Sequence, residues 1–192
     1  MSRVPVIAVS GYPGAGKTTL TRNLAARYGV PALHYDDFET ITSRRSAEIR
    51  DWMARGSDYD EIDLGNLVQA IDDARRTRPR FVILDTLLGR AHGATGSEIA
   101  FSMWIDTTPD IALARKLLHA SGEVGDDPAR ALDFARWVTS YTTHYQGFIS
   151  ETYRLQTMRV RSRADLILPA FDQDSSFSQQ LLPLRSAGFD QQ

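Results

Sequence analysis

The sequence predicts a three-layer αβα fold with a five-stranded parallel sheet. Short β-rich runs alternate with segments of helical periodicity, which is the pattern of parallel strands joined by helices. The strand candidates are residues 4–9, 32–35, 80–84, 101–105 and 165–168. A chain of 192 residues with 42% apolar composition has about the length of one domain and enough apolar side chains for its core. We therefore expect a single domain over residues 1–192.

Apolar spacing predicts the helices that follow the first two strands. Leu20 and Leu24 lie one turn apart within residues 17–28. A second helix shows the i, i+3, i+4, i+7 stripe of Leu64, Leu67, Val68 and Ile71. Each stripe is typical of a helix that covers one face of a sheet.

Capping residues predict two further helices. Thr108, Pro109 and Asp110 supply an N-cap, a first-position proline and an acidic first turn. The apolar face expected for this helix consists of Ile111, Ala114 and Leu118. Asp127 and Pro128 repeat the start signal before a long amphipathic helix. The apolar positions of that helix are Ala131, Phe134, Val138, Tyr141, Tyr145 and Phe148.

The segment between these two helices predicts a loop. Residues 120–127 contain two glycines and no apolar pattern. We expect a short mobile lid around residues 119–130. From residue 172 the chain turns polar, and we expect a tail over residues 172–192.

Charge and cysteine content exclude several classes of function. The 22 Lys and Arg residues are balanced by 24 Asp and Glu residues, whereas a nucleic-acid-binding domain normally carries a basic surface. Cysteine is absent, which removes disulfides, zinc-thiolate clusters, iron–sulfur centres and cysteine nucleophiles. The apolar runs fall far short of the roughly 18 residues of a membrane span. The apolar stretch at the N-terminus is also too short for a signal-peptide core. We expect a cytoplasmic protein that binds neither nucleic acid nor a membrane.

A phosphate-binding loop stands between the first strand and the first helix. Residues 11–18 read GYPGAGKT and match the pattern G-x-x-x-x-G-K-[ST]. The glycines let backbone N–H groups approach phosphate oxygens at the start of the following helix. We expect Lys17 to reach the β and γ phosphates and the Thr18 hydroxyl to bind Mg²⁺. The expected nucleotide contacts are Gly11, Gly14, Ala15, Gly16, Lys17, Thr18 and Thr19.

Acidic residues follow two strands at the same edge of the expected sheet. Residues 81–85 read FVILD, so Asp85 ends an apolar strand where a carboxylate can stand beside the Mg²⁺ of a phosphate loop. Asp36 and Asp37 follow the second strand and emerge at the carboxyl edge, where ligands of open α/β sheets bind. Adjacent residues project differently, so one of this pair is expected to accept the proton of an attacking hydroxyl.

A missing motif and the length narrow the class of phosphate-loop protein. A regulatory GTPase needs an N-K-x-D element to read guanine, and neither Asn23 nor Asn66 stands in one. A motor or transporter ATPase usually needs a larger frame or partner domains. A small-molecule kinase suits a chain of 192 residues better.

Several further segments follow the phosphate loop in an order that is typical of one family of small-molecule kinases. The phosphate loop is followed by YDDF at 35–38, IDTTPD at 105–110, FI at 148–149 and ADLILP at 164–169. This order resembles the uridine kinase branch of the phosphate-loop kinases, which includes nicotinamide riboside kinases, pantothenate kinases and phosphoribulokinases. The resemblance covers roughly residues 4–170.

The resemblance implies a reaction and its residues. Asp36 takes the position of the catalytic aspartate, with Asp37 as the alternative, and Asp85 takes that of the acid at the end of the third strand. The implied cofactors are ATP and Mg²⁺, and the implied reaction transfers the γ-phosphate to a hydroxyl of a small molecule.

The chain departs from this family in the expected lid. Family members usually carry several arginines from the helix after the fourth strand into the lid, where they clamp the transferring phosphate. Here no arginine stands between Arg115 and Arg130. Arg115 is our catalytic candidate, and Lys116 is a further source of charge, because such groups stabilise charge spread over phosphoryl oxygens.

Several residues near the expected site are candidates for acceptor contacts. Arg90 and His92 lie in the loop that leaves the third strand. The rings of Trp52, Tyr59 and Tyr141 either stack on an acceptor or pack in the core. Asp36 completes this set.

We therefore predict a kinase that depends on ATP and Mg²⁺ and acts on a nucleoside-like, sugar, vitamin or secondary-metabolite alcohol. Two alternatives stay open: an ATPase or nucleotide sensor acting through a protein partner, and a nucleoside monophosphate kinase, which the arginine-poor lid disfavours. The expected partners are ATP and the small-molecule acceptor, and a homodimer is among the expected assemblies.

Overall fold

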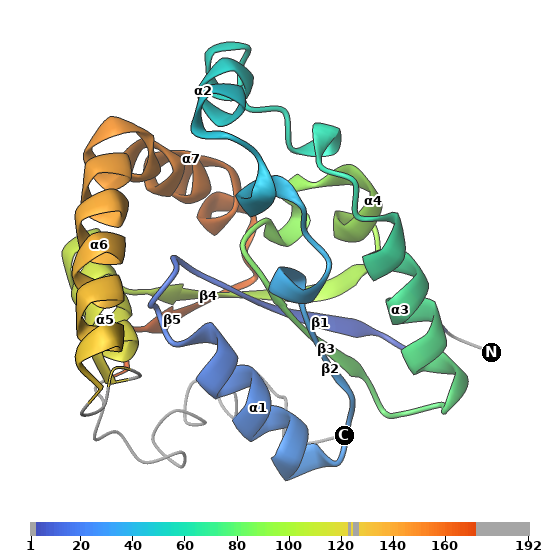
Figure 1. Cartoon of the computed structure of the whole chain (residues 1–192). Coiled ribbons are helices and arrows are strands. Elements are labelled where there is room, and N and C mark those ends of the chain that lie inside the picture. The colour runs from blue at the N-terminus through green and yellow to red at the C-terminus, as the bar shows by residue number, and fades with distance from the viewer. Residues whose placement is uncertain (1–2, 123, 125–126, 172–192) are drawn as a thin grey trace.

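The computed structural model describes residues 3–122, 124 and 127–171 and contains the expected five-stranded parallel sheet (Figure 1). The strands are β1 (Val6–Ser10), β2 (Ala32–His34), β3 (Val82–Thr86), β4 (Ile99–Asp106) and β5 (Leu166–Pro169). Their order in the sheet is β2-β3-β1-β4-β5, and every pairing is parallel. The five strands expected from the sequence are confirmed, with boundaries that differ by one or two residues.

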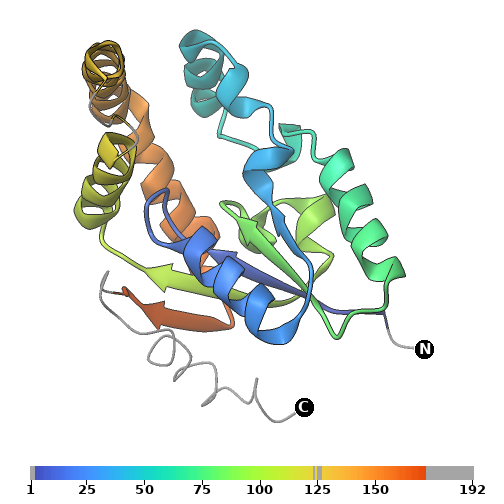
Figure 2. The ribbon, with the colours of Figure 1, turned by 60° about the horizontal axis from the view of Figure 1, so that its bottom comes forward.

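The order of the strands explains the layers. The chain passes from β1 over β3 to β2 and then returns in the opposite direction through β3, β4 and β5. Crossovers between parallel strands are right-handed, so this reversal puts α1 on one face and the later helices on the other. Figures 1 and 2 show α1 (Lys17–Tyr28) on one side of the sheet. The opposite side carries α3 (Gly65–Arg76), α4 (Gly93–Gly96) and α7 (Ser150–Arg159).

The remaining helices surround the end of the sheet where the strands finish. They are α2 (Ser46–Ala54), α5 (Pro109–Gly122) and α6 (Pro128–His144), and α5 lies beside α6 (Figure 1). Short 3-10 turns occur at Tyr35–Asp37, Ile41–Ser43, Tyr59–Glu61, Gly89–Ala91 and Arg161–Arg163.

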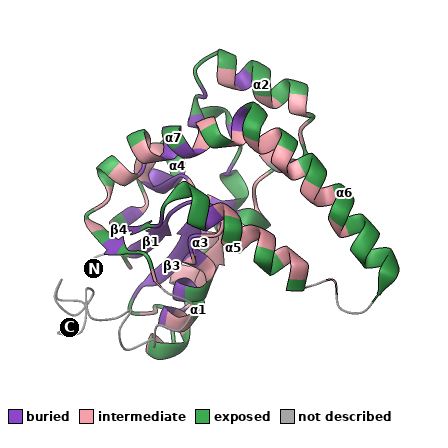
Figure 3. Ribbon diagram, turned by 90° about the vertical axis from the view of Figure 1, so that its left-hand side faces the viewer, coloured by how far each residue is buried: buried purple, intermediate pink, exposed green. Residues whose placement is uncertain are grey.

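The core lies in the sheet and on the helix faces that cover it (Figure 3). All residues of β1 and β3 are buried, as expected of strands covered on both faces. The stripe expected on α1 is confirmed, since Leu20 and Leu24 are buried. In the second stripe Leu67 and Ile71 are buried in α3, Leu64 is buried at its N-cap, and Val68 is half-buried.

The prediction of the apolar face of α5 is wrong. Ile111 is 44% exposed, Leu118 is 58% exposed and Ala114 is also exposed, whereas Ala112 is fully buried. The physical reason is the neighbour of this helix. Its Ala112 side packs on the phosphate loop, where a Cβ on Gly14 would lie 2.1 Å from the Ala112 carbonyl oxygen. A small residue suits such a close approach, so the inward face is not the most apolar one.

The long helix expected after residue 127 forms in three parts. Asp127 caps α6, because its carboxylate accepts the Ala129 N–H at 2.9 Å. A π-helical segment, Tyr145–Ile149, joins α6 to α7. An extra residue per turn rotates the following helix, and buried side chains, absent from α6, reappear at Phe148 and Tyr153.

The loop expected around residues 119–130 is shorter than predicted. Residues 119–122 belong to α5 and residues 128–130 belong to α6. Residues 123, 125 and 126 of the expected lid lie outside the described residues, as does the expected tail at 172–192.

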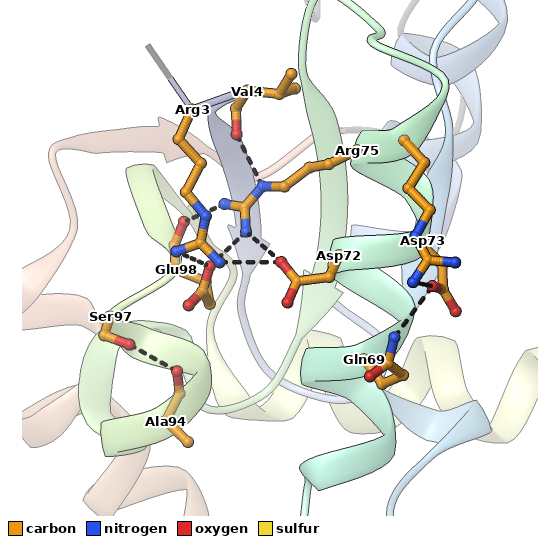
Figure 4. A network of polar contacts seen from close by, with 10 residues as sticks. Arg3, Val4, Gln69, Asp72, Asp73, Arg75, Ala94, Ser97 and Glu98 are labelled. Carbon is orange, nitrogen blue, oxygen red and sulfur yellow. Dashed lines mark hydrogen bonds and ion pairs between the residues drawn. The ribbon is translucent and has the colours of Figure 1, made fainter. Parts of the chain in front are cut away.

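A network of charged residues fastens the end of the sheet opposite the phosphate loop (Figure 4). Arg75 donates to the carbonyl oxygen of Val4, just before β1, at 2.9 Å. Its guanidinium also pairs with Glu98 at 2.5 Å, and Arg3 contacts both Glu98 and Asp72. The network joins α3 to the segments that lead into β1 and β4.

None of the helices in the described part of the chain has the length and apolar character needed to cross a membrane.

Candidate active site

The phosphate loop connects β1 to α1 with two glycines in the left-handed region. Gly14 has φ +87° and Gly16 has φ +97°. Most residues avoid such values, because a Cβ would clash with the following carbonyl. Gly16 stands at the N-cap of α1, so the loop delivers Lys17 and Thr18 as the first helical residues.

Lys17 is buried at the centre of the loop. Its ammonium donates to the carbonyl oxygen of Tyr12 at 3.1 Å. Burial lowers the pKa of Lys17, and the negative charges of Asp85 and Asp36 act in the opposite direction. The ammonium is therefore electrostatically coupled to both carboxylates that the sequence singled out.

Thr18 and Asp85 meet at the end of β3. The Thr18 hydroxyl donates to Asp85 Oδ2 at 2.6 Å. Strand register explains the position of the carboxylate, because Asp85 is the partner of Val9 in β1. The structure thus brings together the two residues expected to bind a metal ion.

His34 is a site residue that the sequence interpretation missed. It is the partner of Asp85 in the β2–β3 register, and its Nδ1 lies 3.4 Å from Asp85 Oδ2. Only the pairing of β2 with β3 reveals this contact, because the two residues are far apart in the sequence.

Asp36 and Asp37 lie in the 3-10 turn that follows β2. Tyr35 anchors this turn in the core with 3% exposure. Asp36 is exposed at the surface, yet partial desolvation of its carboxyl raises its pKa, while the positive charge of Lys17 opposes that shift. Asp85 also acts on Asp36. Asp36 therefore shares one electrostatic site with Lys17 and Asp85, and Asp37 is exposed in the same turn.

The charge supplied by α5 comes from a different residue than the one we expected. Arg115 donates to the carbonyl oxygen of Phe171, beyond the end of β5, so its guanidinium has a structural partner. Lys116, the next residue, acts electrostatically on both Lys17 and Asp36. The backbone of Lys116 also lies against Gly14 of the phosphate loop, so the lysine is the residue of this pair with an observed link to the site.

Arg90 and His92 have structural partners instead of an open position. Arg90 pairs with Asp165 at 2.7 Å and donates to the Ala100 carbonyl oxygen at 2.9 Å. His92 is 3% exposed and accepts the Thr95 N–H on Nδ1 at 3.1 Å. Its Nε2 then carries the proton and donates to the Ile62 carbonyl oxygen at 3.0 Å. Both side chains therefore have structural roles that the sequence interpretation did not anticipate.

The three aromatic candidates differ in their surroundings. Trp52 and Tyr59 are buried and stack on each other with ring centroids 6.2 Å apart, so packing is the correct interpretation. Tyr141 is half-buried and lies under the ammonium of Lys116, which is 5.6 Å from the ring centroid. Of these rings, Tyr141 is the one that the structure brings to the phosphate-loop side.

The other expected nucleotide contacts are positioned by the loop itself. Gly11 and Ala15 are buried, and the Ala15 N–H donates to the Tyr12 carbonyl oxygen at 2.9 Å. Thr19 lies exposed in the first turn of α1.

Known proteins resemble this chain over part or all of its length. A family model described as the AAA domain matches residues 6–94, which include the phosphate loop and Asp85. A shikimate kinase from Rhodopirellula baltica is 29% identical over 111 residues, or 56% of each of the two chains. The chain thus spans about half the length of the curated relative it matches.

Two solved structures share the fold. A kinase assigned to a fructose transport system of Silicibacter sp. TM1040 aligns with a TM-score of 0.55 and 19% identity, over 88% of this chain and 91% of the other. A gluconokinase from Sinorhizobium meliloti 1021 aligns with a TM-score of 0.50 and 16% identity, over 100% of both chains. The chain therefore shares the three-layer α/β fold of these two kinase structures.

Proposed function

We propose that the protein is an ATP-dependent kinase that transfers the γ-phosphate to a hydroxyl of a small molecule. The observation that carries this proposal is the meeting of Lys17, the Thr18–Asp85 pair and Asp36 at the carboxyl edge of the sheet. Fold alone does not define an activity. These side chains supply a phosphate cradle, hard oxygen ligands and a proton acceptor in one place.

The oxygen atoms of Thr18 and Asp85 fit a magnesium ion. Mg²⁺ prefers oxygen ligands and is usually held by one or two protein groups together with substrate phosphates and water. The described residues contain no group of three or more His, Cys, Asp or Glu side chains that could hold a metal by themselves. Two protein oxygen ligands are enough for a Mg²⁺ ion that is also bound by the phosphates of a nucleotide. Thr18 and Asp85 would be these two ligands.

Asp36 is the proposed proton acceptor. Its carboxyl has a raised pKa because of desolvation, with Lys17 limiting the shift. A raised pKa makes a carboxylate a better acceptor for the hydroxyl proton of the incoming alcohol. Asp37 remains the alternative from the same turn.

The relatives support an acceptor of the polyhydroxy class. Their names refer to shikimate, to a fructose transport system and to a gluconokinase. We accordingly propose a small hydroxylated metabolite as the acceptor. The narrower uridine kinase-like assignment, the cytoplasmic location and the homodimer stay predictions from the sequence.

A screen of ATP consumption over hydroxylated metabolites tests the function. Purified protein is incubated with ATP and Mg²⁺, and ADP release is measured with Lys17→Ala as the blank. At least one metabolite is expected to raise turnover well above that blank. If none does, an ATPase or sensor that acts through a protein partner becomes the better interpretation. A preference for nucleoside monophosphates as acceptors would favour the other alternative.

A matched pair of variants tests the proton acceptor on the acceptor found by the screen. Asp36→Asn is expected to lower kcat by about 10²-fold or more, the usual contribution of a general base, while ATP still binds. Asp37→Asn is expected to keep most of the activity. The opposite ranking would transfer the role to Asp37.

A further inference from the structure

Lysine is rare in this chain, and both of its lysines meet at the phosphate site. Lys17 and Lys116 are the two lysines among 22 Lys and Arg residues. Lys116 lies one helical turn after Ala112, the residue of α5 that abuts Gly14 of the phosphate loop. A Cβ on Gly14 would also lie 3.3 Å from the backbone nitrogen of Lys116. This face of α5 therefore packs directly on the loop.

The charges of the two lysines oppose each other. The charge of Lys116 contributes to lowering the pKa of Lys17, and it also acts on Asp36. Like charges repel, so an anion bound between the two ammonium groups would stabilise both of them. Their pairing is the arrangement expected at a site for a multiply charged phosphate.

The ammonium of Lys116 lies over the aromatic ring of Tyr141. Lys116 Nζ lies 5.6 Å from the ring centroid, within the range of a cation–π interaction. The ring itself is fixed by stacking on Trp137, with centroids 5.1 Å apart. A lysine side chain has four rotatable bonds, so a fixed ring restricts where its charge can lie.

Tyr153 links the surroundings of this ring to the phosphate loop. Its hydroxyl donates to the carbonyl oxygen of Pro13 at 3.3 Å, and its side chain also acts electrostatically on Tyr141. The Tyr153 ring is 1% exposed and stacks on Tyr12 of the loop, with centroids 4.6 Å apart.

We propose that Lys116 is the second cation of phosphoryl transfer and that Tyr141 is its positioning residue. This inference rests on the kinase function proposed above. As the bond from the γ-phosphorus to the bridging oxygen of ADP breaks and the bond to the acceptor oxygen forms, Lys116 stabilises the charge on the phosphoryl oxygens. The acceptor proton passes to Asp36, and ADP leaves. In this chain the lysine takes the place that an arginine-rich lid would otherwise have.

Nucleotide affinities of matched variants test the proposal. Calorimetry with ATP, ADP and AMP is carried out on the wild type, Lys116→Met and Lys116→Arg. If Lys116 contacts the γ-phosphate, Lys116→Met should lower the affinity for ATP by about 10-fold or more. The loss should be smaller for ADP and absent for AMP. Lys116→Arg keeps the charge and is expected to recover part of the loss. An ATP to ADP affinity ratio that stays at the wild-type value in Lys116→Met would refute the assignment.

Variants of the ring test the positioning role. Tyr141→Leu removes the ring and is expected to reduce the ATP to ADP affinity ratio, whereas Tyr141→Phe keeps the ring and is expected to retain most of it. In the double variant with Lys116→Met, Tyr141→Leu is expected to cause little further loss, because the two residues act as a unit. Additive losses would show that Tyr141 has a merely structural role.

The two-lysine composition provides a readout that does not depend on turnover. Protein labelled with ¹³C-lysine contains two lysine spin systems, and the ring current of Tyr141 should shift the Lys116 signal. ATP is expected to move that signal more than AMP does, and Tyr141→Leu should abolish the ring-current shift. A wild type that binds no ATP would refute the kinase function itself. A wild type that binds ATP without moving the Lys116 signal would refute this inference alone.

Discussion

Asp85 connects the two sides of the site at the scale of single residues. One carboxylate oxygen accepts from Thr18 at 2.6 Å and lies 3.4 Å from His34. Thr18 belongs to the nucleotide side, whereas His34 lies two residues before Asp36 on the acceptor side. The position of Asp85 therefore affects both halves of the proposed reaction.

The two left-handed glycines of the phosphate loop give a residue-scale prediction. Both Gly14→Ala and Gly16→Ala place a Cβ at positive φ, which costs about 1–2 kcal/mol. Gly14→Ala also brings that Cβ to 2.1 Å from the Ala112 carbonyl oxygen, whereas nothing lies within 4 Å of a Cβ on Gly16. We expect Gly14→Ala to destabilise the protein by about 2 kcal/mol more than Gly16→Ala, because α5 must move. Urea denaturation measures both losses, and equal losses would contradict the packing of α5 on the loop.

Residue types in the motif were readable from the sequence, but their partners were not. The pattern at residues 11–18 identified Lys17 and Thr18, and the end of an apolar strand identified Asp85. Arg115 and Lys116 are neighbours in sequence and equally basic, so only the rotation of α5 decides which one faces the site. The missed contact of His34 depends in the same way on strand register.

At the scale of elements, apolar periodicity predicted the buried faces of α1 and α3, which cover the sheet. It failed to predict the buried face of α5, which packs on the phosphate loop. The apolar stripes of α1 and α3 face the core because the sheet is their neighbour. In α5 the neighbour is the phosphate loop, so the close approach at Ala112 determines the buried face. The π-helical turn at Tyr145–Ile149 was equally unpredictable, because one additional residue leaves the apolar spacing nearly unchanged.

The short helix α4 provides an element-scale prediction through its cap, His92. His92→Leu would leave the Thr95 N–H and the Ile62 carbonyl oxygen buried without their partner, which costs about 1–3 kcal/mol. His92→Asn is expected to restore part of this loss, because asparagine caps helices well. Thermal or urea denaturation measures stability, and calorimetry measures ATP affinity. Unchanged ATP affinity in a destabilised His92→Leu variant is the expected result, whereas a lost affinity at full stability would revive a ligand-binding role.

At the scale of the whole molecule, ion pairs connect segments that are distant in sequence. Arg90 joins the turn after β3 to β4 and to the residue before β5, through the Ala100 carbonyl and Asp165. Arg3, Arg75 and Glu98 do the same at the opposite end of the sheet. The strand order could be expected from alternating strands and helices, but these long-range pairs follow only once the sheet is assembled.

The Arg90–Asp165 pair predicts a dependence of stability on pH. Burial acts to raise the pKa of Asp165, but hydrogen bonds from Arg90 and the Ser102 N–H outweigh it, so the pKa is lowered in the folded protein. A carboxyl with a lowered pKa stabilises the fold above its unfolded value of about 3.9, and that contribution is lost as the pH falls through the folded value.

Replacement of Arg90 measures this contribution. Arg90→Met is expected to reduce the free energy of unfolding by about 1–2 kcal/mol at pH 7, after allowance for partial solvent exposure of the pair. The difference between wild type and variant should shrink below about pH 4. Arg136→Met, which removes a 3.5 Å contact with Asp133 within exposed α6, is the matched control and should show little change. A difference that does not depend on pH would contradict the role of Asp165.

The place of β2 at the edge of the sheet has a consequence for how this protein could acquire new specificity. The phosphate loop and Asp85 extend from β1 and β3, which are buried, whereas Asp36 extends from a three-residue strand with a single neighbour. Close packing therefore constrains the residues that hold the donor nucleotide, whereas the exposed positions between β2 and α3 can change with little effect on them. Exchange of the exposed residues within 36–63 between related chains, with the buried ones kept, is a compact route to altered acceptor choice.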